Sequence, residues 1–378
     1  MPVEGGAPES GFSGFSGFSG FSGFSGFSGY SGSSSSGPQD DPIIVEGLIT
    51  NRDGIAGTWK EVDVVVAENN PEDVESLAGL GPAIRSSLLV FELASCLGFY
   101  YDARFHKAHL WHRESDAGAA KAPLVDMTRP TEAIFRKQLN IVANYSDLRQ
   151  DRISEILSQL KTPSEFLRSI LYMDPSRTPY TLELLSIAQT LANLVEMRFK
   201  YALRCKRPFE YSAQIQPMIW TPPHASLPSG HSTESFTMAR LLWLLMREVG
   251  KYPYNDIEFG KMLMRQAARI AINRTVAGLH FPVDSIAGCV LGLTLAAYLY
   301  ARCGSPNAFP VEFTGWLFDG AVFSGDEDFF WNHLYGVVDD TQQKVDPWVT
   351  QIAADPATIS AGSALLRWLW ERAKEEWA

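Results

Sequence analysis

Cysteine is scarce in this sequence. Its 378 residues include only four cysteines, none of them in a CxxC pair, at Cys96, Cys205, Cys289 and Cys303. This spacing excludes the paired-thiolate pattern of a structural zinc site. Isolated cysteines of this kind are usually small buried apolar side chains, and they do not fix the redox compartment.

Positive charge is also in short supply. The chain has 32 lysines and arginines against 43 acidic residues, a formal net charge of -11. The long-range field therefore repels nucleic acid and anionic membrane surfaces, and we expect no nucleic-acid partner. An anionic ligand needs a local basic pocket.

Long hydrophobic runs are nearly absent. The longest, residues 285–303, approaches the length that spans a membrane, and the next, Leu241–Met246, is far too short. One such run predicts a buried core helix rather than an integral membrane protein. The N-terminus lacks a basic segment followed by an apolar one, so we expect no ordinary secretory signal and favour a soluble, cytoplasmic protein.

Strand signals are few after Pro71, where apolar residues recur at three- and four-residue spacing. We predict an all-α helical bundle over residues 71–378, with helices at Arg85–Tyr101, Thr131–Leu160, Pro163–Tyr172, Thr181–Cys205, Ser232–Val249, Asp256–Asn273 and Pro282–Cys303. Ahead of it, β-branched runs (IIVEGLI, VDVVV) predict an extended arm or hairpin over residues 42–70.

Residues 1–41 contain a low-complexity segment. GFS repeats six times from Gly11 and is followed by GYS and a serine run. Glycine and serine favour a disordered tail that builds no core. The alternative is that the evenly spaced aromatic rings bind a partner or mediate self-association.

Three short segments carry chemistry-bearing residues. The first, KYALRCKRP, places Lys200 and Arg207 seven residues apart, which on a helix is one face. Lysine as a point charge and arginine as a bidentate fork could together bind one oxyanion.

The second segment, LPSGHSTES, is a tight turn ahead of an apolar helical run. It puts Ser229, Gly230 and His231 at a helix N-terminus, where free amides bind anions. His231 is placed to exchange a proton with the ligand. An ordinary helix-capping turn with a surface histidine is the alternative.

The third segment, NRTVAGLHFPVDS, contains Arg274, His280 and Asp284. Pro282 suits the first turn of a helix, so His280 precedes that helix and Asp284 lies in its first turn. Asp284 could accept a hydrogen bond from one ring nitrogen of His280 and leave the other as a nucleophile or ligand. Alternatively, Asp284 only caps the helix.

Together the segments read KX6RP, PSGH and RX5HX3D. This order and spacing resembles the three-part signature of the type 2 phosphatidic acid phosphatase (PAP2) and vanadium haloperoxidase superfamily, of which we expect a soluble member. The third motif of that superfamily usually begins Ser-Arg, and Asn273 stands here at the serine position. The resemblance covers about a quarter of the chain.

The resemblance implies a role for each matching residue. In the phosphatases the histidine matching His280 attacks phosphorus, Asp284 orients it, and His231 protonates the leaving alcohol. Charge on the phosphoryl oxygens would be stabilised by Lys200, Arg207, Ser229, Gly230 and Arg274. In the haloperoxidases the same pocket holds vanadate, and only then would His280 be a metal ligand.

Three functions stay open, of which we favour the first. It is a phosphoric monoester hydrolase that needs no cofactor and acts on a small anionic phosphoester. The second is a haloperoxidase that uses vanadate, peroxide and halide. The third is an assembly protein that acts through the aromatic tail.

The remaining histidines give weaker indications of function. In HKAHLWH, His106, His109 and His112 are three residues apart, and a transition-metal site on a helix face is conceivable, though a packed or solvated face is the simpler interpretation. His224 is near enough in sequence to line the pocket, and His333 has no evident partner.

Overall fold

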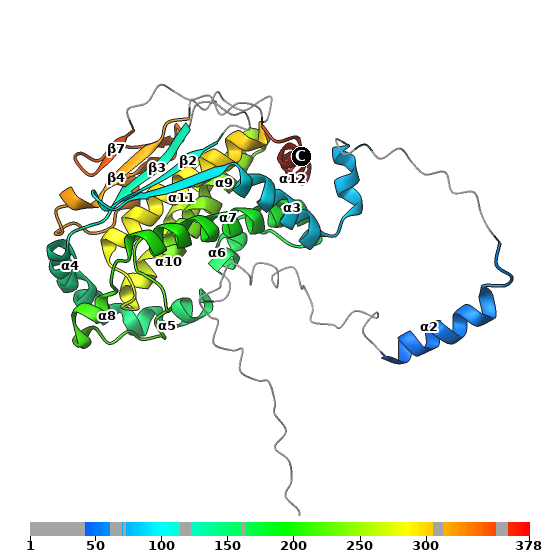
Figure 1. Cartoon of the computed structure of the whole chain (residues 1–378), viewed down its shortest axis with the longest axis horizontal. Helices are drawn as coiled ribbons and strands as arrows, with labels where there is room; N and C mark the ends of the chain where they lie inside the picture. Colours follow the sequence, from blue (N-terminus) through cyan, green and yellow to red (C-terminus); the bar gives the residue numbers. More distant parts are fainter. Residues whose placement is uncertain are drawn as a thin grey trace, which may run out of the picture.

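The computed structural model describes residues 42–60, 70, 73–113, 122–160, 163–304, 313–352 and 362–378. The predicted tail, residues 1–41, lies outside these ranges, as does VDVVV. Figure 1 shows a body of packed helices with a sheet against one side.

Four long helices form the centre of the body. They are α7 (Pro179–Leu203), α9 (Gly230–Val249), α10 (Ile257–Val276) and α11 (Pro282–Cys303). Helix α9 packs against the other three, and α11 is buried along nearly its whole length. These helices confirm the predicted ones within a few residues, because their apolar positions recur at helical spacing on faces that the core covers.

Shorter helices surround this centre. Helices α3 (Pro82–Ser95) and α12 (Ala364–Glu375) pack on α7, and α5 (Arg149–Ser158) and α6 (Pro163–Leu171) pack on α10. The others are α4 (Glu132–Tyr145), α8 (Pro208–Tyr211), and the 3-10 helices η3 (Val74–Gly79), η4 (Ser146–Leu148), η5 (Ala213–Ile215), η6 (Gly320–Val322) and η7 (Trp331–His333).

Two glycines let α11 approach α9 closely. A Cβ added at Gly288 would lie 2.6 Å from the carbonyl oxygen of Ser229, and one at Gly292 would lie 2.4 Å from that of Thr233. Both distances are shorter than a carbon atom tolerates, so the two helices meet backbone to backbone here. The contact at Gly288 touches the PSGH segment directly.

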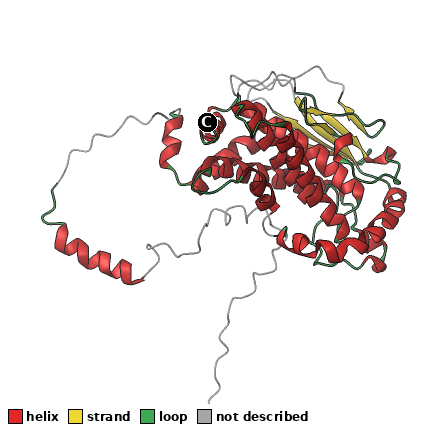
Figure 2. Cartoon of the chain, turned by 180° about the vertical axis from the view of Figure 1, so that it is seen from behind, coloured by secondary structure: helices red, strands yellow, loops and turns green. Residues whose placement is uncertain are grey.

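A five-stranded mixed sheet overturns the all-α prediction in part. Its order is β1 (Leu97–Asp102), β2 (Lys107–His112), β3 (Ala122–Thr128), β4 (Trp316–Asp319) and β7 (Val349–Gln351), with β3 and β4 parallel and the other pairs antiparallel. It lies on one side of the helices (Figure 2), with β3 and β4 against α11. A two-residue pair, β5 (Tyr335–Gly336) and β6 (Thr341–Gln342), is separate.

Two of these strands occupy sequence that was predicted differently. The helix predicted over Arg85–Tyr101 ends at Ser95, and residues 97–101 belong to β1. The HKAHLWH segment was considered as a helix face, but β2 buries every second residue, which is strand periodicity.

The predicted extended arm is also wrong where the structure describes it. Residues Pro42–Ile55 form helix α2, with proline at its start and no buried residue. β-branched residues lower helix propensity by only a few tenths of a kcal/mol each, and proline in the first turn costs no hydrogen bond.

Within the described residues, α11 is the only helix long and apolar enough to cross a membrane. Its apolar stretch is entirely buried inside the fold. The prediction of a buried core helix for this run is therefore confirmed.

Candidate functional site

The three sequence segments meet at one place. The Ser229 amide donates a hydrogen bond to the carbonyl oxygen of Asp284 at 2.9 Å, which joins the second segment to the third. The Arg207 guanidinium donates to the carbonyl oxygen of Leu279 at 3.0 Å, which joins the first to the third. Lys200 Nζ donates to the carbonyl oxygen of Pro228, which joins the first to the second. The predicted residues thus form one buried cluster between α7, α9, α10 and α11.

His280 lies just before α11 with both ring nitrogens engaged. Its Nδ1 is 3.1 Å from Asp284 Oδ2 and 3.2 Å from Ser226 Oγ. Its Nε2 faces an Arg207 nitrogen at 3.3 Å. Burial, together with the charges of Arg207 and Lys200, lowers the pKa of His280 well below its usual value. The ring is therefore neutral, and because a carboxylate can only accept, Nδ1 carries the proton and Nε2 the lone pair.

Asp284 is held through one of its two carboxylate oxygens. Its Oδ2 accepts hydrogen bonds from the Ser226 hydroxyl and, at 3.0 Å, from the Phe281 amide, so it also caps α11. Burial raises the pKa of Asp284 to about 6 against the lowering effect of these donors. The capping and orienting functions considered as alternatives coexist in this residue, and its carboxylate form predominates at neutral pH.

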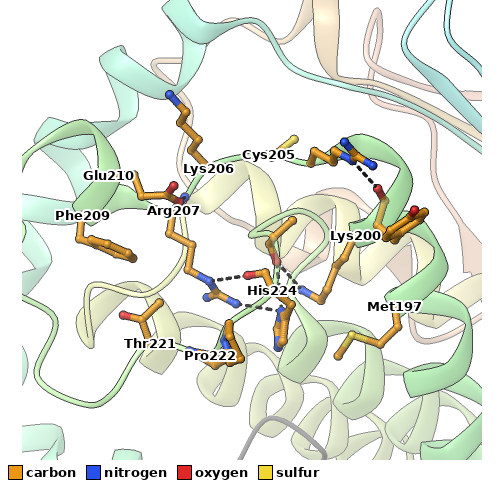
Figure 3. A pocket seen from close by; sticks show the side chains of 14 residues that line it. Met197, Lys200, Cys205, Lys206, Arg207, Phe209, Glu210, Thr221, Pro222 and His224 are labelled. Atoms are coloured by element: carbon orange, nitrogen blue, oxygen red, sulfur yellow. Dashed lines mark hydrogen bonds between the residues drawn. The ribbon is translucent and has the colours of Figure 1, made fainter.

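Lys200 and Arg207 do not share a helix face, contrary to the prediction. Helix α7 ends at Leu203, and Arg204 adopts a left-handed conformation with φ of 51°. Arg207 lies beyond this turn and returns to the site through hydrogen bonds to His224, whose carbonyl oxygen is 3.1 Å from Nε (Figure 3). A change of chain direction, not helical spacing, brings the two cations together.

The ammonium group of Lys200 is held by carbonyl oxygens, including that of Ser226 at 3.1 Å. Burial lowers the pKa of Lys200 to about 8, which leaves it mostly charged at neutral pH. Burial lowers the pKa of Arg207 to about 10. Both groups therefore supply positive charge to the cluster near pH 7.

Arg274 presents buried donors that no described residue accepts. One of its terminal nitrogens donates to Gln159 Oε1 at 3.0 Å and to the carbonyl oxygen of Ile156 at 3.2 Å. Its Nε and its other terminal nitrogen are buried and have no acceptor among the described residues, and the hydroxyl of Ser229 has no partner there either. Leaving a buried donor unsatisfied costs about 1–3 kcal/mol. Such a group of free donors is the arrangement that an oxyanion would satisfy.

Gly230 and His231 are the first two residues of α9. His231 Nε2 is 3.1 Å from the carbonyl oxygen of Gln159, a contact that does not engage Nδ1. Burial and the charge of Arg274 lower the pKa of His231 to about 3. A bound anion would offset that charge and raise the pKa again.

The cluster opens into a cavity of about 710 Å³. Its polar lining includes Arg207, Gly230, His231, Arg274 and His280. Much of the remaining wall is apolar and comes from Leu157, Leu160, Met197, Pro217, Met218, Ile219, Trp220 and Leu279. The polar groups thus lie at one part of a pocket whose other walls suit a carbon-rich group.

A second cavity, of about 690 Å³, adjoins the first at Arg207, Met197, Pro222 and His224. Figure 3 shows Lys200, Lys206 and Arg207 around it. His224 therefore lines both cavities, as the sequence suggested. Its Nδ1 is 3.1 Å from an Arg207 nitrogen, so it holds the guanidinium in place.

Sequence reasoning missed four polar residues of this site. Ser226 and Gln159 hold Asp284, Arg274 and His231, and Glu196 and Glu234 line the larger cavity. Ser226 is three residues before Ser229, and Glu196 is one helical turn before Lys200, so proximity to the motifs was the available signal. Gln159 lies between α5 and α6, far from the motifs, and the sequence there carries no such signal.

The HKAHLWH histidines do not converge. His109 Nδ1 is 2.8 Å from Asp126 Oδ1, His112 is buried against the Tyr298 hydroxyl at 3.0 Å, and His106 contacts Tyr101. The described part of the chain contains no group of three metal-binding side chains, so the metal hypothesis gains no support. His333 packs against Phe330 with the two rings tilted and their centroids 5.4 Å apart.

Comparison with known proteins agrees with this geometry. Residues 182–304 match the model of the PAP2 superfamily, a span that runs from α7 to the end of α11 and contains all eight predicted site residues. No curated protein matches the chain. The resemblance seen in the three motifs is thereby confirmed: the chain contains a PAP2 superfamily domain, and the buried cluster lies within it.

Proposed function

We propose that this protein is a phosphoric monoester hydrolase that works through a phosphohistidine at His280. One observation carries the proposal: a neutral His280 ring, held at Nδ1 by Asp284, lies in a pocket that Arg274 also lines, and buried donors of Arg274 and Ser229 have no acceptor among the described residues. The neutral ring supplies a nucleophile, and the donors match the oxygens of a phosphoryl group.

In the first step the Nε2 lone pair attacks phosphorus, a P–N bond forms, and the P–O bond to the leaving alcohol breaks. The Nδ1 proton stays between the ring and Asp284, whose carboxylate stabilises the charge that develops on the imidazole. Lys200, Arg207 and Arg274 offset the charge on the non-bridging oxygens. Arg207 must exchange its contact with Nε2 for one with the substrate.

His231 completes the proton balance. A dianionic phosphate beside Arg274 offsets the cationic charge that lowers the pKa of His231, so the histidine takes up a proton as substrate binds. It gives that proton to the departing alkoxide oxygen. In the second step His231 accepts a proton from water, the water oxygen attacks phosphorus, the P–N bond breaks, and phosphate leaves.

The experiment is hydrolysis of a chromogenic aryl phosphate by purified wild type, His280→Ala and His109→Ala. The control fits closely because His109 also pairs with an aspartate, Asp126, but on the sheet outside the pocket. Loss of activity in His280→Ala alone supports the proposal. Full activity in His280→Ala would rule out the assigned nucleophile.

Vanadate is the second candidate for the same donors. The neutral His280 ring with its Nε2 lone pair is also the form that binds a metal, and Lys200, Arg207, Ser229, Gly230 and Arg274 would hold the oxygens. Bound vanadate would supply peroxide activation for halide oxidation. Assaying halide oxidation by peroxide after loading with orthovanadate separates the two functions. Phosphatase activity that vanadate inhibits, without halide oxidation, would exclude the second.

A further inference from the structure

Glu196 lies where an acidic group is unexpected. It lies on α7 one turn before Lys200 and is only 2 % exposed. It lines the same cavity as Arg274, His231 and His280. A carboxylate in that position would repel the anion that the neighbouring cations attract.

The carboxyl group of Glu196 is not fully satisfied by the part of the chain that the structure describes. Its Oε2 is buried without a hydrogen bond among the described residues. Its Oε1 lies against Gly230, where an added Cβ would be 2.4 Å away. Lys200, one helical turn further along α7, directs its ammonium group to the carbonyl oxygens of Ser226 and Pro228. Gly230 therefore leaves room for this carboxyl group as well as for a ligand.

We propose that Glu196 keeps its proton and donates it as a hydrogen bond to an oxygen of the bound oxyanion. A neutral carboxylic acid is a donor of the right kind for this pocket, whereas its carboxylate accepts only. The proposal rests on the phosphate-binding role of the pocket, and it adds to that role a neutral group that the three motifs do not contain.

The charges around Glu196 also favour its protonated form. Burial raises the pKa of Glu196 well above its usual value, and the charge of Glu234 on α9 raises it further. Lys200 on α7 and Arg207 before α8 oppose this. The other titratable groups lining the cavity are His231 on α9, Arg274 on α10, His280 before α11 and His224. A bound phosphate dianion adds a further like charge and favours the protonated acid still more.

The consequence is a pH dependence with a defined sign. At pH values below the raised pKa of Glu196, the acid donates to phosphate. Above it, the carboxylate repels phosphate and affinity falls. Phosphate itself titrates in this range, and Lys200, whose pKa is about 8, loses charge on the same side. A comparison with a variant that changes only Glu196 removes both contributions.

Glu196→Gln is that variant, because the amide keeps a donor of the same size and does not titrate. Binding of inorganic phosphate is measured by calorimetry between about pH 6 and about pH 9. We expect similar affinities at the acidic end. Towards alkaline pH the variant gains on wild type by up to about tenfold per pH unit. A ratio of affinities that does not change with pH would overturn the proposal.

Glu234→Gln should shift the pH dependence of phosphate binding to lower pH. Removing the charge of Glu234 lowers the pKa of Glu196, so the alkaline loss of phosphate affinity begins at a lower pH than in wild type. An unchanged or higher onset would overturn the proposal. The matched control is Glu376→Gln, which replaces another carboxyl group whose pKa burial raises, at the far end of α7 where it caps Tyr180 and Thr181. It should leave the phosphate curve unchanged.

The role of Glu196 in phosphate binding and the hydrolase function can be disproved independently. If phosphate binds with the expected pH dependence in the Glu196→Gln comparison but no phosphoester is hydrolysed, the hydrolase function is wrong and the role of Glu196 stands. If phosphoesters are hydrolysed but the ratio of variant to wild-type phosphate affinity does not change with pH, the hydrolase function stands and the role of Glu196 is wrong. A wild-type protein that binds no phosphate at any pH would overturn both.

Discussion

The close contact between α11 and α9 allows the site to be perturbed without changing any residue that touches substrate. Gly288→Ala places a methyl group 2.6 Å from the carbonyl oxygen of Ser229, a backbone atom that cannot rotate away. The two helices must separate locally by roughly half an ångström, and overpacking of this kind costs about 1–3 kcal/mol. Because Ser229 and Asp284 are joined across this contact, the donor at residue 229 moves relative to His280.

Catalysis should suffer more than stability. A misplacement of about 1 Å can cost about 100-fold in rate, so roughly half that shift predicts a loss on the order of tenfold in kcat. The control is Gly292→Ala, one turn further along α11. Its methyl group meets the carbonyl oxygen of Thr233 at 2.4 Å and costs comparable stability away from the site.

The assay pairs thermal unfolding with aryl phosphate hydrolysis for both variants. We expect similar falls in Tm and a clearly larger fall in kcat for Gly288→Ala. Equal losses of kcat in the two variants, or full activity in Gly288→Ala at a lowered Tm, would refute the claim that this helix contact positions the site.

Three further predictions follow from the same geometry. Asp284→Asn removes the negative charge beside Nδ1–H and leaves one acceptor oxygen where the carboxylate had two, so it should lower kcat by about 10²–10⁴-fold at neutral pH, measured by steady-state kinetics. Because burial raises the pKa of Asp284 to about 6, the pH–rate profile should fall as pH drops through that value and the carboxylate is protonated; a flat profile there would contradict this. Arg274→Lys removes the free Nε and terminal donors and should weaken inhibition by inorganic phosphate by about tenfold or more, with an unchanged inhibition constant counting against it.

The tail can be tested separately. Deleting residues 1–41 should leave kcat/KM unchanged, because every residue that lines the cavity lies between Leu157 and His280. A smaller oligomer on size-exclusion chromatography after the deletion would support self-association through the aromatic repeats. A loss of catalysis would contradict the assignment of the site to the helical body.

The sequence predicted the central helices because each has an apolar stripe of helical period that the core covers. It also predicted the juxtaposition of His280 and Asp284, since four residues at a helix start place these side chains together. It mispredicted β1 and β2, because HKAHLWH alternates over only six residues and short runs of this kind fit either period. The strands form through long-range pairing with β3 and β4, which local spacing does not encode.

The features of the site that the sequence did not predict all depend on tertiary packing. Glu196 and Lys200 are four residues apart, the ordinary spacing of a surface ion pair, and only the packing of α7 on α9 buries them. The Arg207 side chain reaches the site because the chain reverses at Arg204, which no periodicity predicts. Gln159 binds Arg274 and His231 from the turn that follows α5, which is far from them in sequence.

The central claim is that phosphate becomes bonded to His280. Rapid quenching of wild type during turnover of a phosphoester, under alkaline conditions that preserve phosphohistidine, followed by peptide mass spectrometry, tests it most directly. We predict a phosphoryl group on His280 that is absent from His280→Ala and present in His109→Ala. A phosphoryl group on His231, on His224 or on a non-histidine residue would contradict the assignment.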